Sequence, residues 1–213
     1  MLDHAIVKRN RREHLALTGL TIKEFKKLSR AFAQAEQEEM TRANAQRERE
    51  REPGGGRTPT LYDSNQRLFF ILVYYKTYTL QVVHGKLFDL SQSRANRLIH
   101  ELTPILVRAL DILEVVPERN PKKVSKAIGN KGRVIDLIID GTDRERQRPK
   151  NKDAQTLHYS GKQKTHTDKN LVLVNRKTTK IEYLSQTYPG TAHDKKIADH
   201  EGIRYPRKTR VFK

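Results

Sequence analysis

The stretch "LIIDGTDRERQRPKN", residues 137–151, places a carboxylate, Asp140, directly after an apolar run and follows it with a series of cationic side chains. The apolar, β-branched residues from 133 to 140 predict a buried strand that ends at Asp140. Two interpretations of Asp140 compete. Either it is a polar residue at a solvated turn, or it is a metal-binding carboxylate beside a surface that holds a polyanionic substrate.

The composition favours the second interpretation. The 213 residues include 43 Lys and Arg against 25 Asp and Glu, which gives a net charge of +18. Such a positive excess attracts nucleic acid or an anionic membrane. The membrane alternative is weak, because the longest apolar run, residues 68–75, is far shorter than the roughly 20 residues that span a bilayer. The absence of cysteine excludes disulfides and thiolate metal sites and fits a reducing compartment, so we expect a cytoplasmic protein that binds nucleic acid and no membrane.

Residues 1–52 are expected to form an N-terminal helical region. Thr21 and Glu24 have the spacing of a capping box at the start of a helix. An apolar stripe then recurs every three to four residues, formed by Ile22, Phe25, Leu28 and Phe32. Good helix formers continue to about residue 52, and the Pro- and Gly-rich residues 53–60 predict a hinge.

Residues 61–117 predict a compact group of helices. Asp63 is placed to cap the first of them, and its apolar residues 68–75 favour a buried helix by context, although periodicity alone also permits a strand. A short helix follows, with one face lined by Leu80, Val83 and Leu87. Ser91 or Ser93 then caps a longer helix, whose inner face is formed by Ala95, Leu98, Ile99 and Leu102.

A short helix, a tight turn and a second helix with polar side chains on its first turns is the layout of a helix-turn-helix, which places its second helix in the major groove of DNA. The candidate base-reading and phosphate-contacting side chains on the outer face of this helix are Gln92, Arg94, Asn96, Arg97 and His100. Arg pairs with guanine, and Asn or Gln pairs with adenine. A three-helix bundle with a polar face gives the same pattern without DNA binding, but the net charge favours DNA.

The second half of the chain changes character. A polar linker, residues 118–132, precedes strand-like segments at 133–140, 164–175 and 180–188, which predict an antiparallel meander with the first strand most buried. A short helix is expected over 193–200 and a fourth strand at "TRVFK", residues 209–213. The predicted fold class is therefore α+β, with an all-helical helix-turn-helix region followed by an incomplete RNase-H-like α/β domain over residues 133–213.

An ordered set of motifs carries a specific resemblance: "PGGGRTPTL", "LFDLSQSRANRLIHEL", "IIDGTDRERQRPK" and "YLSQTYPGTAHDKKIADHEGI". The chain resembles bacterial insertion-sequence transposases of the DDE superfamily, which are related to the eukaryotic Harbinger-type elements. The resemblance implies a helix-turn-helix region that binds the element's DNA ends, and a catalytic domain in which two Asp and one Glu hold two divalent ions, usually Mg²⁺, for DNA cleavage and strand transfer. It matches Asp140 to the first acid, with Gly141 leaving space for a DNA backbone.

The resemblance also implies a difference from the family. The second Asp is expected just past the fourth strand and the Glu on a later helix, whereas this sequence reaches only "TRVFK". Asp194 is an alternative second metal ligand, although the first turn of a helix also favours an acid there. We therefore expect a truncated or frameshifted product that is inactive alone. The alternatives are a non-catalytic DNA-binding protein that occupies element ends and regulates transposition, and a basic structural or RNA-binding protein.

The cationic run after Asp140 is expected to neutralise the phosphates of a DNA strand near the acid, and the alternative is a solvated hairpin loop. The candidate phosphate-contacting residues are Arg144, Arg146, Arg148, Lys150, Lys152, Lys162 and Lys164. The expected partners are double-stranded DNA, as terminal inverted repeats and target DNA, and either a second copy of the chain or a full-length transposase. The expected location is the bacterial nucleoid.

Overall fold

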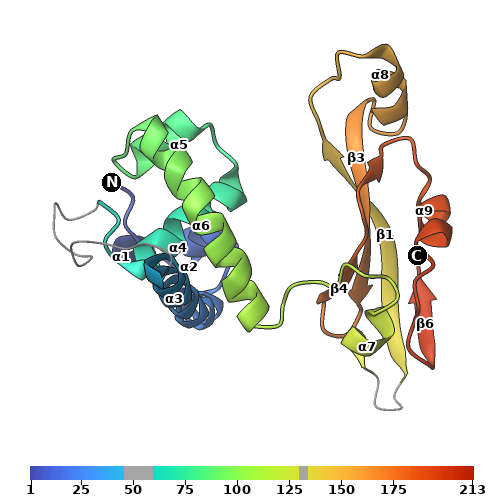
Figure 1. The fold of residues 1–213 in the computed structure, drawn as a ribbon, viewed down its shortest axis with the longest axis horizontal. Helices are drawn as coiled ribbons and strands as arrows, with labels where there is room; N and C mark the ends of the chain where they lie inside the picture. Colours follow the sequence, from blue (N-terminus) through green and yellow to red (C-terminus); the bar gives the residue numbers. More distant parts are fainter. Residues whose placement is uncertain (46–59, 130–133) are drawn as a thin grey trace. The chain divides into compact units, whose positions relative to one another are not determined.

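The computed structural model describes residues 1–45, 60–129 and 134–213, and the chain divides into two compact units, Met1–Val115 and Val116–Lys213 (Figure 1). Apart from Thr60, the expected hinge at 53–60 lies outside the described residues, as does the expected end of the first long helix near residue 52. Within the described ranges, no helix combines the length and apolar character needed to cross a membrane.

The described residues of the first unit form helices. These are α1 (His4–Val7), α2 (Arg11–Thr18), α3 (Ile22–Ala45), α4 (Ser64–Thr77), α5 (Gln81–Leu87) and α6 (Gln92–Ile112). The capping box of α3 is confirmed, because Thr21 Oγ1 accepts from the Glu24 N–H at 3.3 Å and Glu24 Oε2 accepts from the Thr21 N–H at 2.8 Å. The short helices α1 and α2 were not predicted, since neither is long enough to show an apolar period.

One apolar core holds these helices together. The helix over residues 68–75 is confirmed as α4, in which Leu68, Phe69, Phe70 and Ile71 are all completely buried. A helix buried on every side has no polar face, which explains why its periodicity was ambiguous. The predicted inner faces of α3 and α6 contribute to the same core. The N-terminal helical region and the helix-turn-helix therefore pack as one unit.

The helix α5 differs from the expectation in its orientation. Leu80, Val83 and Leu87 do share one face, but that face is turned to solvent, with exposed fractions of 74%, 45% and 38%. The buried positions of α5 are His84 and Gly85. Gly85 is required there, because a Cβ would lie 2.7 Å from the carbonyl oxygen of Leu90 in the turn before α6. The close approach of α5 to this turn decides which face is buried.

The second unit is built on a mixed sheet. Its described elements are α7 (Val124–Ile128), β1 (Ile135–Glu145), α8 (Lys152–His158), β2 (Tyr159–Ser160), β3 (Thr165–Asn175), β4 (Ile181–Leu184), β5 (Tyr188–Pro189), α9 (Asp194–Glu201) and β6 (Thr209–Phe212). The strand order is β2-β3-β1-β6, with β4 and β5 also paired to β3. The antiparallel meander β1–β3–β4 is confirmed, and β6 adds to β1 in parallel. The whole chain is thus of the α+β class.

Two expectations for this sheet are wrong. The first strand does not end at Asp140, because β1 continues to Glu145 and pairs with β3 along that whole length. The most buried strand is β3 rather than β1, since β3 has neighbours on both edges for most of its length, while β6 reaches only as far as Ile138 on β1. The expected loop after Asp140 is correspondingly shorter, and it contains α8.

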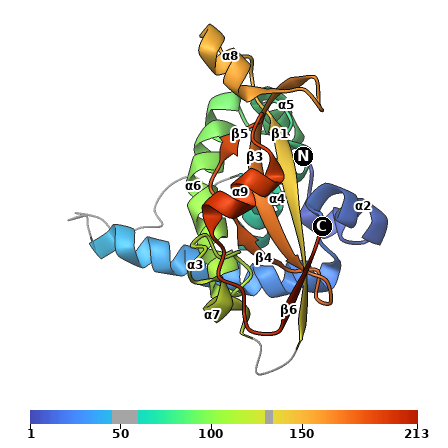
Figure 2. The ribbon, with the colours of Figure 1, turned by 90° about the vertical axis from the view of Figure 1, so that its right-hand side faces the viewer.

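The sheet has one covered face. Leu137, Leu173 and Tyr183 are completely buried there beneath Val124 of α7, in a segment that the sequence indicated only as a linker. The helix α9 also lies across the strands (Figure 2) and is fixed by Glu201, whose carboxylate accepts hydrogen bonds from the hydroxyls of Tyr183 and Tyr188. On the opposite face, the apolar side chains of Ile138, Val172 and Val174 remain partly exposed.

Candidate functional site

Asp140 lies in the middle of β1 on the less covered face of the sheet. Its side chain is exposed, and its Oδ1 accepts from the N–H of Gly141 at 2.9 Å. On β3 its partner is Val172, and on the other side the last paired residue of β6 is Phe212, opposite Ile138. Because successive side chains of a strand alternate, Asp136 and Arg144 lie on the same face as Asp140. The carboxylate is therefore accessible to a ligand from this face.

The opposite face of β1 carries a separate group of charges around Lys169 of β3. The Nζ of Lys169 lies 3.1 Å from Asp194 Oδ1 in an ion pair without hydrogen-bond geometry, 3.8 Å from Asp143 Oδ1, and donates to the carbonyl oxygen of Ala192 at 3.0 Å. Gly141 makes this possible, since a Cβ at that position would lie 2.4 Å from Asp194 Oδ1. The space beside Gly141 thus holds a carboxylate rather than a DNA backbone.

This geometry separates the two candidate acids. The Gly141 position faces Asp194, so the neighbouring Asp140 projects to the other side of the sheet. Asp194 is the first residue of α9, and His193 precedes it as the N-cap. The two carboxylates therefore lie on opposite faces of β1.

The described residues do not form a complete metal site. Among them, no cluster of three or more His, Cys, Asp or Glu side chains could hold an ion. The nearest acid along the same strand face, Asp136, is already engaged, because Arg210 donates to its two oxygens at 2.7 and 2.9 Å and thereby lowers the pKa of its carboxyl group. Asp140 fits as one oxygen ligand, and an ion there would need further ligands that the described residues do not supply.

The helix-turn-helix presents its candidate residues on different sides of α6. Gln92, Arg97 and His100 are exposed. Arg94 is only partly exposed and lines a groove of about 680 Å³ beside Glu36 and Glu39 of α3, so it is turned away from that outer face. Asn96 lies on the side of α5 and donates from Nδ2 to Gln81 Oε1 at 3.0 Å. Ser91, rather than Ser93, caps the helix.

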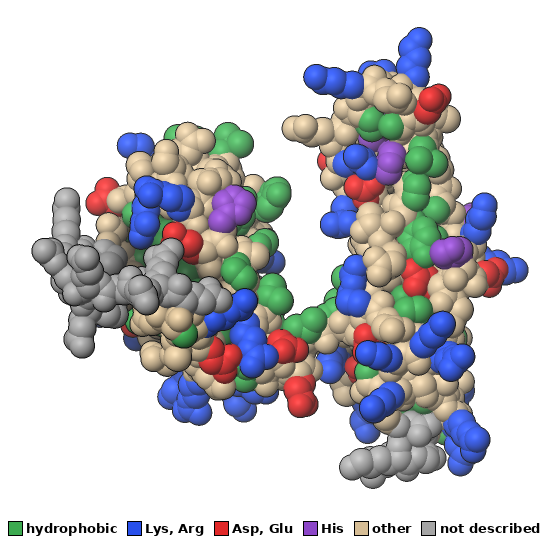
Figure 3. Space-filling model, viewed as in Figure 1, with side chains coloured by type: hydrophobic (Ala, Val, Ile, Leu, Met, Phe, Trp, Pro, Cys, Tyr) green, Lys and Arg blue, Asp and Glu red, His purple; other side chains and the backbone are tan. Residues whose placement is uncertain are grey.

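The cationic residues after Asp140 lie at one end of the second unit. We call residues 144–164 the basic arm; it includes α8 and β2, and Lys and Arg side chains project around α8 in Figure 3. Its candidate phosphate-contacting residues are all exposed: Arg144, Arg146, Arg148, Lys150, Lys152, Lys162 and Lys164. Arg146 is partly neutralised, because its Nη1 donates to Asp168 Oδ1 at 2.9 Å. Among the described residues, Arg148 donates to the neutral Gln155 and pairs with no acid, so its charge stays available.

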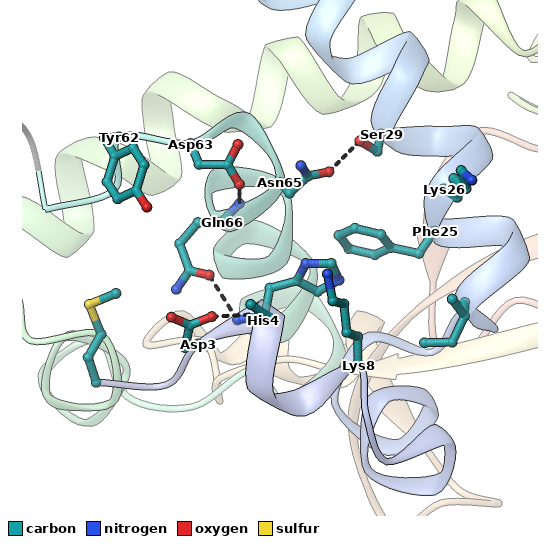
Figure 4. A pocket seen from close by; sticks show the side chains of 13 residues that line it. Asp3, His4, Lys8, Phe25, Lys26, Ser29, Tyr62, Asp63, Asn65 and Gln66 are labelled. Atoms are coloured by element: carbon teal, nitrogen blue, oxygen red, sulfur yellow. Dashed lines mark hydrogen bonds between the residues drawn. The ribbon is translucent and has the colours of Figure 1, made fainter.

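A pocket of about 430 Å³ in the first unit is a further concave site (Figure 4). Its wall includes the ring of His4, stacked on Phe25 at 4.2 Å between ring centroids. Burial lowers the pKa of His4 to about 4, with a smaller contribution from the neighbouring charges. The polar groups of the wall bond to each other: Ser29 donates to Asn65, and Gln66 accepts from the His4 N–H. These contacts bind α1 to α3 and α4, and they account for the pocket without a ligand.

Sequence reasoning missed two groups near the candidate site. The partner of Asn96, Gln81, is not adjacent in sequence, and only the α5–α6 packing brings the two amides together. The Lys169 cluster joins β1, β3 and α9, and its only local signal is a glycine inside a strand, which often marks a close approach.

Comparison with known families agrees with this architecture. Residues 59–112, which contain α4 to α6, match the helix-turn-helix of DDE superfamily endonuclease, and residues 139–210, which run from within β1 to within β6, match the DDE superfamily endonuclease itself.

The chain belongs to the DDE superfamily.

Its two matched segments are the DNA-binding and endonuclease parts of a DDE-family transposase. No curated protein and no solved structure gives a significant match. DDE superfamily endonucleases act on DNA with divalent metal ions, so the partner and the class of cofactor follow from the family. Asp140 is the second residue of the endonuclease match, and its carboxylate is exposed on the strand and so accessible to an ion.

Proposed function

We propose that this DDE-family chain recognises the ends of a bacterial insertion sequence as double-stranded DNA. The observation that carries the proposal is the outer face of α6, where Gln92, Arg97 and His100 are exposed on a helix that a buried core holds rigidly. Exposed polar forks on the first turns of such a helix are suited to base edges in the major groove. The same region could bind terminal inverted repeats and, less specifically, target DNA.

The basic arm would supply contacts to phosphates. Its exposed cations precede and follow α8, and Arg144 shares the strand face of Asp140, four residues further along β1. A phosphodiester that approaches Asp140 is repelled by the carboxylate unless cations lie nearby. The arm therefore favours binding of a DNA strand next to the candidate metal ligand.

The proposed chemistry is Mg²⁺-dependent cleavage and strand transfer, with Asp140 as one metal ligand. Two Mg²⁺ ions in such a site stabilise the attacking and leaving oxygens at phosphorus, which requires several carboxylate ligands. On this face Asp136 is paired with Arg210 and Asp168 with Arg146, and the described residues form no group of three or more acids or histidines that could hold an ion. We therefore propose that the chain alone binds DNA without cutting it and that the site is completed by another transposase or a second copy. The same observation favours a second candidate function, a protein that occupies element ends and regulates transposition.

A gel-shift experiment tests recognition. Arg97→Ala with His100→Ala is expected to remove sequence-specific binding, while Arg30→Ala, an exposed cation on α3, is the matched control for loss of charge. Specific binding that survives the double substitution would show that α6 is not the recognition helix.

The salt dependence tests the arm separately. Each phosphate contact contributes about −0.9 to the slope of log K against log salt concentration. Arg148→Ala with Lys150→Ala should therefore reduce the slope by about 1.8 and weaken binding to all sequences alike. An unchanged slope would exclude these two side chains from contact with DNA.

A cleavage assay with Mg²⁺, on DNA that the chain binds specifically in the gel shift, tests the catalytic proposal. No nicking is expected from the purified chain. Nicking that depends on Mg²⁺ and disappears in Asp140→Ala would contradict the proposal that the chain is inactive alone, while it would support Asp140 as a metal ligand. Nicking by a mixture of this chain with a transposase that carries all three acids, with and without Asp140→Ala in this chain, separates completion of the site from simple occupation of DNA.

A further inference from the structure

A side-chain hydrogen bond joins the two helices of the helix-turn-helix. Gln81 is the first residue of α5, and Asn96 lies in the second turn of α6. The Nδ2 of Asn96 donates to Oε1 of Gln81 at 3.0 Å, although the two residues are fifteen positions apart. Both side chains are partly exposed, so neither amide is buried in the core. The contact lies at the surface, next to the residues that the proposed function assigns to DNA.

This bond determines how the Asn96 carboxamide is presented. An asparagine amide has two donor hydrogens on Nδ2 and an acceptor, Oδ1. With one hydrogen engaged by Gln81, the carboxamide keeps one donor and one acceptor for a ligand. While Gln81 presents Oε1 to Asn96, the flipped Asn96 amide is disfavoured, because it would place two acceptors, Asn96 Oδ1 and Gln81 Oε1, against each other. The order of donor and acceptor that Asn96 presents is therefore coupled to the orientation of the Gln81 amide.

We infer that Gln81 is a positioning residue for base recognition, and that Asn96 reads the adenine of an A·T pair. The inference rests on the proposed entry of α6 into the major groove. Adenine presents a donor at N6 and an acceptor at N7, which match Oδ1 and the remaining Nδ2 hydrogen of Asn96 as a bidentate pair. Guanine presents two acceptors on this edge, so a carboxamide that offers one donor and one acceptor discriminates against it.

The role differs from those of the neighbouring polar residues. Arg97 and His100 are exposed on the outer face of α6, whereas Asn96 is held from the side by α5. A side chain that is already ordered loses less conformational entropy when it binds. Gln81 makes this contribution from a different helix, without needing to touch the base itself.

The test is selection from a library of double-stranded oligonucleotides with a randomised central region, carried out with the full chain. The wild type is expected to select a site that contains an invariant A·T pair. Asn96→Ala should lose that preference, with a reduction in discrimination of roughly 5- to 150-fold, the range for a bidentate base contact. Gln81→Ala should lose preference at the same position and at no other, and the double variant should lose no more than either single variant, because the two residues act as one unit.

Two further variants keep the outcomes distinct. Gln81→Glu retains the oxygen that accepts from Asn96 and should keep the A·T preference, although its negative charge weakens binding to every sequence. Gln37→Ala, an exposed glutamine on α3, should change neither property. If Gln81→Ala retains the preference that Asn96→Ala loses, or if their effects add, the positioning role is overturned while the proposed function stands. If the wild type selects no sequence at all, the proposed recognition by α6 fails, and this inference fails with it.

Discussion

The two units of the chain are stabilised in different ways. In the first, one continuous core takes side chains from α1, α3, α4 and α6. In the second, the main cluster of completely buried apolar side chains is small, formed by Val124, Leu137, Leu173 and Tyr183, and polar groups hold the periphery. Lys169 joins two acids across β1, β3 and α9, and Glu201 anchors α9 through two tyrosines. The first unit therefore depends on apolar burial, and the second depends more on polar contacts and strand pairing.

This difference bears on function. The recognition helix α6 is supported by a large core, so its outer face can be varied with little effect on the fold. The candidate metal ligand Asp140 lies on a thin sheet, one residue from the glycine that admits Asp194. Substitutions near Asp140 therefore test both the site and the fold, and each needs a control for stability.

The largest expected effect is in the core of the first unit. Phe70 is completely buried, with its ring 5.0 Å from that of Phe88 and 4.4 Å from that of His84. Phe70→Ala should leave a cavity and reduce the free energy of unfolding of this unit by about 3–5 kcal/mol. Hydrogen exchange measured by mass spectrometry should show lost protection in α4 and α6 and unchanged protection in β1 and β3. Phe212→Ala, in the second unit and 38% exposed, is the control. Equal loss of protection in both units would show that their cores are not independent.

The second effect is a loss of stability of the first unit at acidic pH. Burial lowers the pKa values of His4 and His84 to about 4 in the folded first unit. In the unfolded chain these histidines have the ordinary pKa of about 6.5, so as the pH falls they take up protons at a higher pH than in the folded unit. The free energy of unfolding is therefore highest above about pH 6.5 and decreases as the pH falls towards 4. Each histidine should contribute on the order of 2 kcal/mol to this loss. Lys8 and His14 lower the pKa of His4 further, while Asp3 and Asp63 oppose them.

The measurement is urea unfolding of the first unit, followed by hydrogen exchange, at pH 7.5 and pH 5. The variant with His4→Phe and His84→Phe should lose most of the difference between the two pH values. The comparison is restricted to pH 5 and above because exposed carboxylates such as Glu24, whose pKa is lowered by its hydrogen bonds to Thr21, titrate below that range. A variant as acid-sensitive as the wild type would assign the effect to other groups.

An intermediate effect is expected at Gly141 in the second unit. A Cβ there would lie 2.4 Å from Asp194 Oδ1, so Gly141→Ala must displace Asp194 from Lys169 and should cost about 1–3 kcal/mol. Gly161→Ala is a matched control, because nothing lies within 4 Å of a Cβ at that position. Adding Asp194→Ala to Gly141→Ala should recover part of the loss in the thermal unfolding temperature. If the double variant is less stable than Gly141→Ala alone, the contact between these two positions is not the cause.

The sequence predicted the first unit better than the second, because the patterns that indicate its helices lie within short stretches of sequence. The stripes on α3 and α6 and the caps at Thr21, Asp63 and Ser91 are local patterns, and the structure confirms them. The buried face of α5 was not predictable. Leu80, Val83 and Leu87 form an apolar stripe, but this stripe is exposed to solvent and does not pack on the core. The identity of its buried face depends on the tight contact of Gly85 with the following turn.

In the second unit, the length of β1 depends on its long-range pairing with β3, which the local sequence pattern does not indicate. The apolar run before Asp140 suggested a strand end, but the charged residues after it still pair with β3, since a strand edge tolerates exposed cations. The sequence indicated Asp140 as a candidate ligand and Asp194 as a possible partner. Which face of the sheet each occupies follows from the register of β1 and the placement of α9, and neither has a local signature.

The smallest effect compares two helix caps. Ser91 caps α6, with Oγ accepting from the Arg94 N–H at 3.2 Å, and Asn151 caps α8, with Oδ1 accepting from the Ala154 N–H at 3.0 Å. Each substitution by alanine removes a similar hydrogen bond, which is worth about 1 kcal/mol to a helix. Because α6 has a buried face and α8 has no buried residue, Ser91→Ala should lower the thermal unfolding temperature of its unit, whereas Asn151→Ala should only increase hydrogen exchange within α8. A global loss of stability from Asn151→Ala would mean that α8 is coupled to the sheet, and the salt dependence of DNA binding should then change with it.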